Sequence, residues 1–212
     1  MLTVIIKNDG EENVVKLTYE NIFKELKDIP GSQLLVQDDW STSGVKTPYV
    51  CFLEADCLVS SGYFASQLGL FKKNTYFRKL AMMSSSTGVN NWANKFYGYT
   101  VGNGHADGIV PSTDKKSGSP YPIQIGYVPG AIIRRKMLDN AIKSLKLSNG
   151  AERDLVQYST CISLAFWQQG DGNPVYINPN ATYVTTEDYV NDIGHFKHDG
   201  AKVVDMFRKQ SI

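Results

Sequence analysis

Residues 49–57 read Tyr-Val-Cys-Phe-Leu-Glu-Ala-Asp-Cys, and this stretch decides the fold class. Its first five residues are apolar on both faces, which is typical of a strand in the middle of a sheet with layers above and below. The strand ends in two acids separated by one residue, Glu54 and Asp56. Ligands of open α/β sheets bind at the carboxyl ends of the strands, so these two acids mark a candidate site.

Two predicted strands precede this one. The β-branched run Leu2–Ile6 ends at a turn, and Leu34–Val36 ends in acids. Between them, apolar residues at helical spacing predict a helix that stops at Pro30-Gly31. This strand–helix–strand order indicates an α/β sheet. Only residues 38–48 separate the second strand from the third, which is short for a parallel crossover, so these strands are either antiparallel or not neighbours.

The rest of the chain carries weaker signals. The pattern predicts a weak strand at 81–83, a long loop at 84–122, a strand or turn running into a helix at 130–145, a helix at 154–169, a strand at 175–177 and a final helix at 201–208.

Composition limits the classes of protein. The chain has 212 residues, 22 basic and 21 acidic, and 42% of them are hydrophobic, which favours one folded domain over disorder. A net charge of +1 argues against a protein that grips duplex DNA through many phosphates. No apolar run approaches the length of a membrane span, and no leader follows Met1. With only 3 cysteines, we therefore expect a cytoplasmic protein with no membrane span.

Spacing alone says little about the acids after the third strand. Pairs of acids separated by one residue also occur at Asp9/Glu11 and Glu152/Asp154, and a solvated strand end is the simplest explanation of any one pair. The placement of Glu54 and Asp56 carries the information. Two hard oxygen ligands at that point suit Mg²⁺ or Mn²⁺, ions that also bind substrate phosphates.

Four segments, taken in order, resemble motifs of the family 2-like glycosyltransferases of the GT-A fold. Residues 49–57, followed by Ser-Gly-Tyr-Phe at 61–64, resemble the DXD segment, and Leu-Leu-Val-Gln-Asp-Asp-Trp-Ser-Thr at 34–42 resembles the nucleotide loop. Gly-Tyr-Val-Pro-Gly-Ala-Ile-Ile-Arg-Arg at 126–135 resembles the glycine turn before the acceptor-side helix. Gly-Ala-Glu-Arg-Asp-Leu at 150–155 resembles the Glu-Asp motif more loosely.

The chain departs from the family pattern at three points. The helix and strand that the family usually carries before the DXD strand are nearly absent, since only residues 38–48 stand there. The first acid of the DXD segment is Glu54, and Arg153 interrupts the Glu-Asp pair.

The resemblance implies a fold and an activity. It implies a single GT-A (Rossmann-like) α/β domain over residues 1–212, with a mixed, mostly parallel sheet flanked by helices. Its nucleotide-binding half would cover about 1–58 and its acceptor-side half about 59–212. The implied activity is metal-dependent transfer of a sugar from a nucleotide-diphosphate sugar to the hydroxyl of an unidentified acceptor, which could be a glycan, a protein or a modified nucleic acid.

The resemblance also implies the residues of the site. The implied ligands of Mn²⁺ or Mg²⁺ are Glu54, Asp56, His195 and His198. The implied nucleotide-sugar contacts are Asp38, Asp39, Trp40, Glu54, Asp56, Gly130, Arg134 and Arg135. The implied base that deprotonates the acceptor is Asp154, with Glu152 as the alternative.

Each of these roles competes with a structural one. Trp40 is as readily explained by core packing as by a nucleobase, and the arginine pair by the start of a helix. Two other functions also stay open. One is a non-catalytic module of the same fold that binds a glycan or nucleotide. The other is a nucleotidyltransferase, for which the residues 7–10 make a poor phosphate loop.

Overall fold

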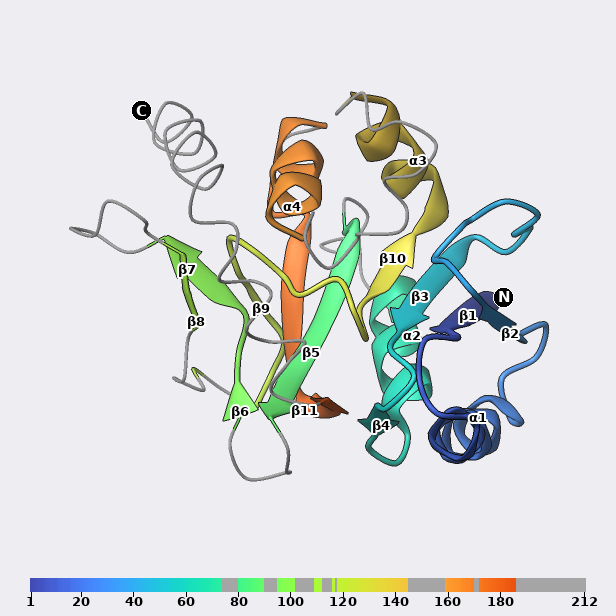
Figure 1. Cartoon of the computed structure of the whole chain (residues 1–212). Coiled ribbons are helices and arrows are strands. Elements are labelled where there is room, and N and C mark those ends of the chain that lie inside the picture. Colours follow the sequence, from blue (N-terminus) through green and yellow to red (C-terminus); the bar gives the residue numbers. More distant parts are fainter. Residues whose placement is uncertain are drawn as a thin grey trace.

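A computed structural model describes residues 1–73, 80–89, 95–101, 109–111, 116, 118–144, 159–169 and 172–185 (Figure 1). The helices are α1 (Glu12–Leu26), α2 (Tyr63–Lys73), α3 (Arg135–Ser144) and α4 (Ser159–Gln168). The strands are β1 (Leu2–Lys7), β2 (Gln33–Gln37), β3 (Tyr49–Leu53), β4 (Leu58–Val59), β5 (Met82–Val89), β6 (Lys95–Phe96), β7 (Tyr99–Val101), β8 (Ile109–Pro111), β9 (Tyr121–Pro122), β10 (Ile132–Arg134) and β11 (Val175–Thr185).

The main sheet is mixed and mostly parallel, flanked by helices, as the sequence predicted. Its strand order is β2-β1-β3-β10-β5-β11-β4, with β6 beside β5 and β9 beside β11. The pairings make β1, β2, β3, β5 and β11 run in one direction, whereas β10 and β4 run against them. We call the side where those five strands end the carboxyl edge, and the opposite side the amino edge.

The two strands joined by the short 38–48 connection are not neighbours. Both β2 and β3 pair in parallel with β1, which lies between them. This arrangement confirms the second of the two expected possibilities, because the connection skips over one strand. Val45 anchors it, with 3% of its surface exposed and its carbonyl bonded to the Arg135 guanidinium.

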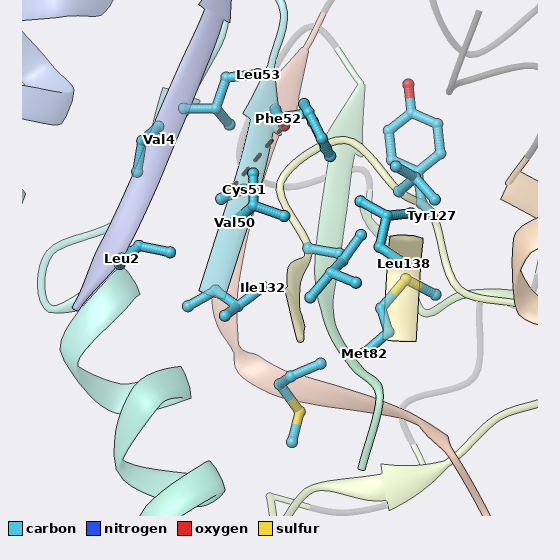
Figure 2. Close-up of a cluster of buried hydrophobic side chains, with 14 of the residues drawn as sticks. Leu2, Val4, Val50, Cys51, Phe52, Leu53, Met82, Tyr127, Ile132 and Leu138 are labelled. Carbon is cyan, nitrogen blue, oxygen red and sulfur yellow. Dashed lines mark hydrogen bonds between the residues drawn. The ribbon is translucent and has the colours of Figure 1, made fainter. Parts of the chain in front are cut away.

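Strand β3, the apolar run at residues 49–53, lies in the interior. Val50, Cys51, Phe52 and Leu53 are each 0% exposed, so β3 is buried on both faces as its composition predicted (Figure 2). β1 packs beside it with a run of equally buried apolar side chains. Burial on both faces requires a layer on each side of the sheet.

Those two layers meet β5 on opposite faces. Neighbouring residues of a strand point to opposite faces. The Ser84 hydroxyl donates to the Tyr127 carbonyl at 3.1 Å, whereas Ser85 Oγ accepts from the Tyr63 hydroxyl of α2 at 2.7 Å. Helix α2 therefore covers one face, and the segment around Tyr127 covers the other.

Helix α4 holds that second segment by a regular set of contacts. Ser159 Oγ accepts from the Val128 amide at 3.1 Å, and Ser163 Oγ accepts from the Gly126 amide at 3.2 Å. One turn further along, Trp167 Nε1 donates to the Gln124 carbonyl at 3.0 Å. The contact residues are four apart on α4, which is a rise of about 6.0 Å, and two apart on the 124–128 segment, which is about 6.6 Å for extended backbone. The spacing of the contacts is therefore nearly the same on both segments.

The predicted loop at 84–122 was wrong over its described part. Strand β5 continues to Val89, and β6, β7, β8 and β9 follow within this region. The hydroxyl side chains of β5 hid the strand, because a polar run reads as a loop. In the structure Ser84, Ser85, Ser86 and Thr87 are buried.

The remaining helix predictions divide into three cases. Helix α2 was not predicted. Helix α4 begins at Ser159, within the helix predicted at 154–169, and residues 154–158 of that prediction lie outside the described residues. The predicted helix at 201–208 also lies outside them. No helix within the described residues is long and apolar enough to cross a membrane.

Candidate functional site

Five acids gather at the carboxyl edge of three adjacent strands. The register pairs Ile6 of β1 with Val36 of β2 and with Leu53 of β3, so the residues after each strand reach the same edge. These acids are Asp9 after β1, Asp38 and Asp39 after β2, and Glu54 and Asp56 after β3. This topology is consistent with a candidate site at the carboxyl ends of the strands, as predicted from the sequence.

Helix α1 shapes the loop that carries Glu54 and Asp56. The buried Thr18 hydroxyl donates to two carbonyls of that loop, Ala55 at 2.6 Å and Cys57 at 3.1 Å. A hydroxyl with two acceptors fixes the path of the loop between them. The position of both acids thus depends on a helix residue to which the sequence assigned no role.

The turn after β1 packs directly against the same loop. A Cβ atom on Gly10 would lie 2.8 Å from the Ala55 Cβ, which is too close for a side chain. Glycine is required there by close approach, and the two acid-bearing loops form one packed unit.

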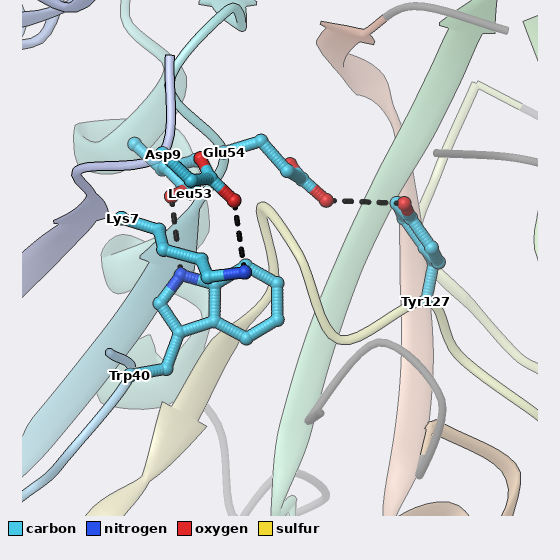
Figure 3. Close-up of polar contacts among 6 residues, drawn as sticks. All are labelled: Lys7, Asp9, Trp40, Leu53, Glu54 and Tyr127. Atoms are coloured by element: carbon cyan, nitrogen blue, oxygen red, sulfur yellow. Dashed lines mark hydrogen bonds and ion pairs between the residues drawn. The ribbon is translucent and has the colours of Figure 1, made fainter. Parts of the chain in front are cut away.

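Glu54 is a buried carboxyl group. Its side chain is 0% exposed, and the Tyr127 hydroxyl donates to its Oε1 at 3.2 Å (Figure 3). Its Oε2 atom is buried with no hydrogen-bond partner among the described residues. Burial is the main cause that raises its pKa from 4.5 to about 8, and the nearby charges of Asp56 and Asp9 act in the same direction, whereas the hydrogen bonds from its own backbone and from Tyr127 act against it. Glu54 is therefore mostly protonated at neutral pH.

The other acids of the edge are accessible. Asp56 is half-buried, with its Oδ1 atom buried, and Asp38 is exposed. Asp9 Oδ2 forms an ion pair with Lys7 Nζ at 2.8 Å, and its side chain is 28% exposed. Asp39 Oδ1 accepts from the Ser41 amide at 3.2 Å, which turns this carboxylate toward its own loop. A ligand at this edge would therefore meet Asp9, Asp38 and Asp56 first.

Asn8 links the ends of β1 and β2. Its side-chain amide donates to Asp38 Oδ1 at 3.2 Å, and its backbone amide donates to the Gln37 carbonyl at 2.6 Å. The Asp38 carboxylate is thereby oriented by the neighbouring strand.

Trp40 lies in the core. Its side chain is 2% exposed, and its Nε1 donates to the Leu53 carbonyl at 3.3 Å (Figure 3). Its ring lies 6.1 Å from the Phe52 ring, and Lys7 Nζ lies 5.7 Å from its centroid. This placement agrees with the core-packing explanation, because the ring presents no open face on which a nucleobase could stack.

Gly130 is also explained by packing. Its φ is +74°, and a Cβ there would lie 2.7 Å from the Tyr63 hydroxyl oxygen and 2.9 Å from the Tyr183 ring. Its amide donates to the Phe52 carbonyl at 2.8 Å. The residue is buried, and its bond to Phe52 stabilises the strand that leads to Glu54.

Arg134, a predicted nucleotide contact, lies away from the acids of the carboxyl edge. Because β10 runs against β3, Arg134 pairs with Tyr49 at the start of β3 and lies at the amino edge. Glu54 follows the other end of that strand, about 16 Å away along it. The guanidinium donates to the Leu80 carbonyl at 2.6 Å and to the Tyr49 hydroxyl at 3.3 Å.

Arg135, also a predicted nucleotide contact, lies at the same edge as Arg134. Its amide donates to the Pro48 carbonyl at 3.0 Å and its guanidinium donates to the Val45 carbonyl. Both groups fasten the 38–48 connection to the amino edge. The two arginines are structural residues, as the competing explanation of a helix start allowed.

Four predicted site residues lie outside the described residues: Glu152, Asp154, His195 and His198. Within the described residues, no group of three or more His, Cys, Asp or Glu side chains is arranged to hold a metal ion. The donor chemistry of Glu54 and Asp56 does fit a hard divalent cation, because both offer carboxylate oxygens and one buried oxygen of Glu54 has no described partner.

Tyr127 is the residue that sequence reasoning missed. It stands inside the glycine-turn motif at 126–135, and no role was predicted for it. The available signal was its phenol in an otherwise apolar stretch, since a buried tyrosine hydroxyl usually finds a polar partner. Here that partner is Glu54.

Comparison with known proteins identifies the fold. No family model and no curated protein matches the chain. Among solved structures, GalNAc-T7 with UDP, GalNAc and Mn²⁺ matches with a TM-score of 0.55 and 12% identity over 91% of this chain. The TarS protein of S. aureus matches with a TM-score of 0.53 and 10% identity over 92% of this chain. The chain has the GT-A fold.

The GT-A likeness covers only part of those proteins. This chain covers 47% of the GalNAc-T7 chain and 38% of the TarS chain, which is less than half of each. At 10–12% identity the likeness establishes the GT-A architecture alone.

Proposed function

We propose that this chain is a glycosyltransferase domain that binds a nucleotide-diphosphate sugar at the carboxyl edge and transfers the sugar to an acceptor hydroxyl. The observation that carries the proposal is the pair Glu54 and Asp56 directly after the buried strand β3, in a chain with the GT-A fold. A structural neighbour, GalNAc-T7, was solved with UDP, GalNAc and Mn²⁺. The sugar, the nucleotide and the acceptor stay open.

Mn²⁺ or Mg²⁺ is the proposed cofactor. When bound, such an ion would neutralise the diphosphate and stabilise the leaving group. Asp56 is its proposed accessible ligand and Glu54 its proposed buried one, with His195 or His198 as a further ligand. Glu54 would have to lose its proton to serve, because its pKa is about 8.

The chain's own residues have distinct proposed tasks. Tyr127 positions the Glu54 carboxyl through its hydroxyl, and Asn8 orients Asp38 toward the donor. Asp154 is the proposed base that takes the proton of the acceptor hydroxyl, with Glu152 as the alternative. Replacing Asp154 by Asn should lower transfer by at least about a hundredfold while donor binding persists.

The test is a thermal-shift titration with UDP, GDP and CDP, each with and without Mn²⁺. Ligand binding to the native state raises stability by about 2.7 kcal/mol at a hundredfold excess over Kd. We expect one diphosphate to raise Tm only with Mn²⁺, and D56N to abolish the shift. The matched control is D28N, since Asp28 is an exposed acid outside the carboxyl edge. A metal-independent shift, or a full shift in D56N, would contradict the proposal.

A second measurement separates the alternatives. Release of free sugar from UDP-sugars with Mn²⁺ indicates a transferase, whereas diphosphate binding without any donor turnover favours the non-catalytic module. Lys7 gives the nucleotidyltransferase little support, because its ammonium already pairs with Asp9 and lies over Trp40.

A further inference from the structure

Strand β2 forms one end of the sheet and leaves one side of its backbone unused. Within the described residues it pairs with β1 alone, and no further strand lies beyond it (Figure 1). The Gln37 carbonyl accepts from the Asn8 amide at 2.6 Å, so the backbone groups of Gln37 point toward β1. These directions alternate along a strand, so the backbone groups of Leu34 and Val36 point away from β1. No described group bonds them.

This open side of β2 lacks the features that usually protect an end strand. Lysine, proline, a bulge or a very short strand normally prevents pairing with another chain. β2 reads Gln-Leu-Leu-Val-Gln, pairs with β1 in an unbroken register, and has Val36 40% exposed. β4, at the other end of the sheet, contains only Leu58–Val59. Of these two end strands, β2 is therefore the one suited to pair with another chain.

Helix α1 adds apolar surface beside β2. The side chains of Tyr19 and Phe23 are 38% and 55% exposed, and their rings stack with centroids 6.0 Å apart. Together with Leu34 they line a groove of about 500 Å³ between α1 and the start of β2. Leu34 and Val36 point to the same face of the sheet, so the apolar surface continues from the groove to Val36. Exposed apolar surface of this kind marks an interaction site.

The 38–48 connection passes over the interior of the sheet. Its Thr47 hydroxyl lies 2.7 Å from Thr3 Oγ1 of β1, and its Trp40 indole donates to the carbonyl at the end of β3. Thr3 pairs with Gln33, and the Thr3 hydroxyl donates to Gln33 Oε1 at 3.3 Å, so both point to one face. The connection therefore covers that face of β1 and β3, whereas the groove lies on the other face.

The sequence of β2 fits a second copy of itself. In an antiparallel pair centred on Leu35, Leu34 stands opposite Val36 of the second copy, and Gln33 stands opposite Gln37. Leu34 and Val36 have outward backbone groups, so they can exchange both hydrogen bonds. A shift of two residues in either direction would place Leu35 opposite a glutamine. The centred register is therefore the one that sets apolar against apolar and amide against amide.

The charges around β2 agree with this register. The five residues of β2 carry no charge, and Asp38 falls opposite Ser32 of the second copy. Ser32 and Lys27 line the same groove, and Asp28 does not line it. The acid that follows β2 thus comes to the end of the groove where a lysine lies, and the symmetry repeats this arrangement. Such complementarity helps to fix a register.

We propose that the chain forms a symmetric dimer in which the β2 strands of two copies pair antiparallel and join the two sheets into one. Tyr19 and Phe23 of each copy add apolar contact on the α1 face. The pairing uses the open side of both copies, so the assembly closes at two. A strand of another protein could also pair here, but the near-palindrome of β2 favours a second copy. The dimer requires neither nucleotide nor metal, so it does not depend on the proposed function.

Sedimentation velocity of the full chain at a series of micromolar concentrations tests the proposal. We expect a dimer, and V36K should weaken association by at least about tenfold because it sets a charge against an apolar side chain. V36P should act similarly, since proline removes an outward N–H that β1 does not use. L58K is the matched control, because Leu58 is 41% exposed on β4. Thermal melting shows whether each variant is folded.

Cysteine cross-linking tests the register. In L35C the two new cysteines meet on the two-fold axis with Cα atoms about 4.5 Å apart, within the range of a disulfide. Oxidation should give a covalent dimer on a non-reducing gel. V36C should cross-link far less, because residue 36 faces residue 34 of the second copy. Oxidised wild type provides the baseline for the native cysteines, of which Cys51 and Cys57 are buried.

Four outcomes would overturn the proposal. They are a monomer at every concentration, association that L58K abolishes while V36K and V36P retain it, equal cross-linking of V36C and L35C, and a monomer in which the amides of Leu34 and Val36 exchange slowly. The last outcome would show that another segment occupies the open side. D56N should associate as wild type does, so failure of the donor site and failure of the dimer are distinguishable.

Discussion

The two edges of the sheet differ in what their charged residues do. At the carboxyl edge Asp9, Asp38 and Asp56 are at least partly accessible, and they lie on the loops after three parallel strands. At the amino edge Arg134 and Arg135 are bonded to carbonyl groups of the chain itself. The acids are therefore available to a ligand, whereas the arginines stabilise the fold.

The difference teaches that strand direction decides which edge a residue joins. Arg134 and Arg135 end a motif that lies between the acid loops and the last strand in sequence, and a nucleotide role for them is natural if all strands run one way. Strand β10 runs against β3. One reversed strand moves both cations to the far edge.

D56N should have the largest effect, and it tests whether the acids of the carboxyl edge bind a ligand. We expect the affinity for the nucleotide diphosphate in the presence of Mn²⁺ to fall by more than about a hundredfold. Replacing a residue that only supports a metal ligand typically costs about 10–100-fold, and Asp56 is proposed as a ligand itself. The free energy of unfolding should change little, because asparagine keeps the size of the side chain and one of its acceptor oxygens. Calorimetric titration and urea denaturation measure the two quantities. Unchanged affinity would mean that the acids of this edge are merely solvated.

The next effect concerns Glu54 and pH. Its pKa is about 8 in the folded chain and 4.5 is its ordinary value, so between these limits the folded state keeps a proton that the unfolded state loses. The free energy of unfolding should fall by about 1.4 kcal/mol per pH unit in this window and level off above it.

E54Q should remove that dependence while keeping an acceptor for Tyr127. Urea denaturation at pH 5.5, 6.5 and 7.5 gives the slope for both proteins. Equal slopes in wild type and E54Q would show that burial does not raise the pKa of Glu54 in the folded chain.

G130A tests the support beneath the carboxyl edge. The added methyl group meets the Tyr63 hydroxyl and the Tyr183 ring at a positive φ, so we expect a loss of about 2–3 kcal/mol in stability. G44A is the matched control, because Gly44 has a φ of +80° and nothing within 4 Å of its Cβ position. It should lose only about 1 kcal/mol. Similar losses in the two variants would assign the whole effect to backbone conformation.

R134K should have the smallest effect, and it tests whether Arg134 at the amino edge stabilises the fold. R134K keeps the charge but loses the Nε bond to the Leu80 carbonyl, which should cost about 1 kcal/mol of stability. Nucleotide binding should not change. If R134K instead weakened diphosphate binding and left stability intact, the assignment of the two edges would be reversed.

Sequence reasoning predicted the parts of the fold that depend on local pattern. The apolar run at 49–53 and the helix before Pro30 are readable because burial imposes a period on the residues. Strand β5 was missed beyond Met83, since its buried hydroxyls are satisfied by distant groups such as the Ala181 carbonyl. No local pattern reveals a partner 95 residues away.

The candidate site divides in the same way. Glu54 and Asp56 could be placed at the sheet edge from sequence, because the end of a buried strand is a local property. The burial of Glu54 under Tyr127 and the position of Arg134 depend on pairing between strands far apart in the chain. Such tertiary facts require the structure.

The match between α4 and the 124–128 segment has a consequence for how the gene can vary. Ser159, Ser163 and Trp167 of α4 contact every second residue of that segment, and they bond its backbone groups. A substitution in the segment therefore changes a side chain but leaves these backbone groups opposite the helix. Loss or gain of one codon between Gln124 and Val128 would turn alternate backbone groups away from the helix. We expect insertions and deletions in natural variants to avoid these five positions while point changes accumulate.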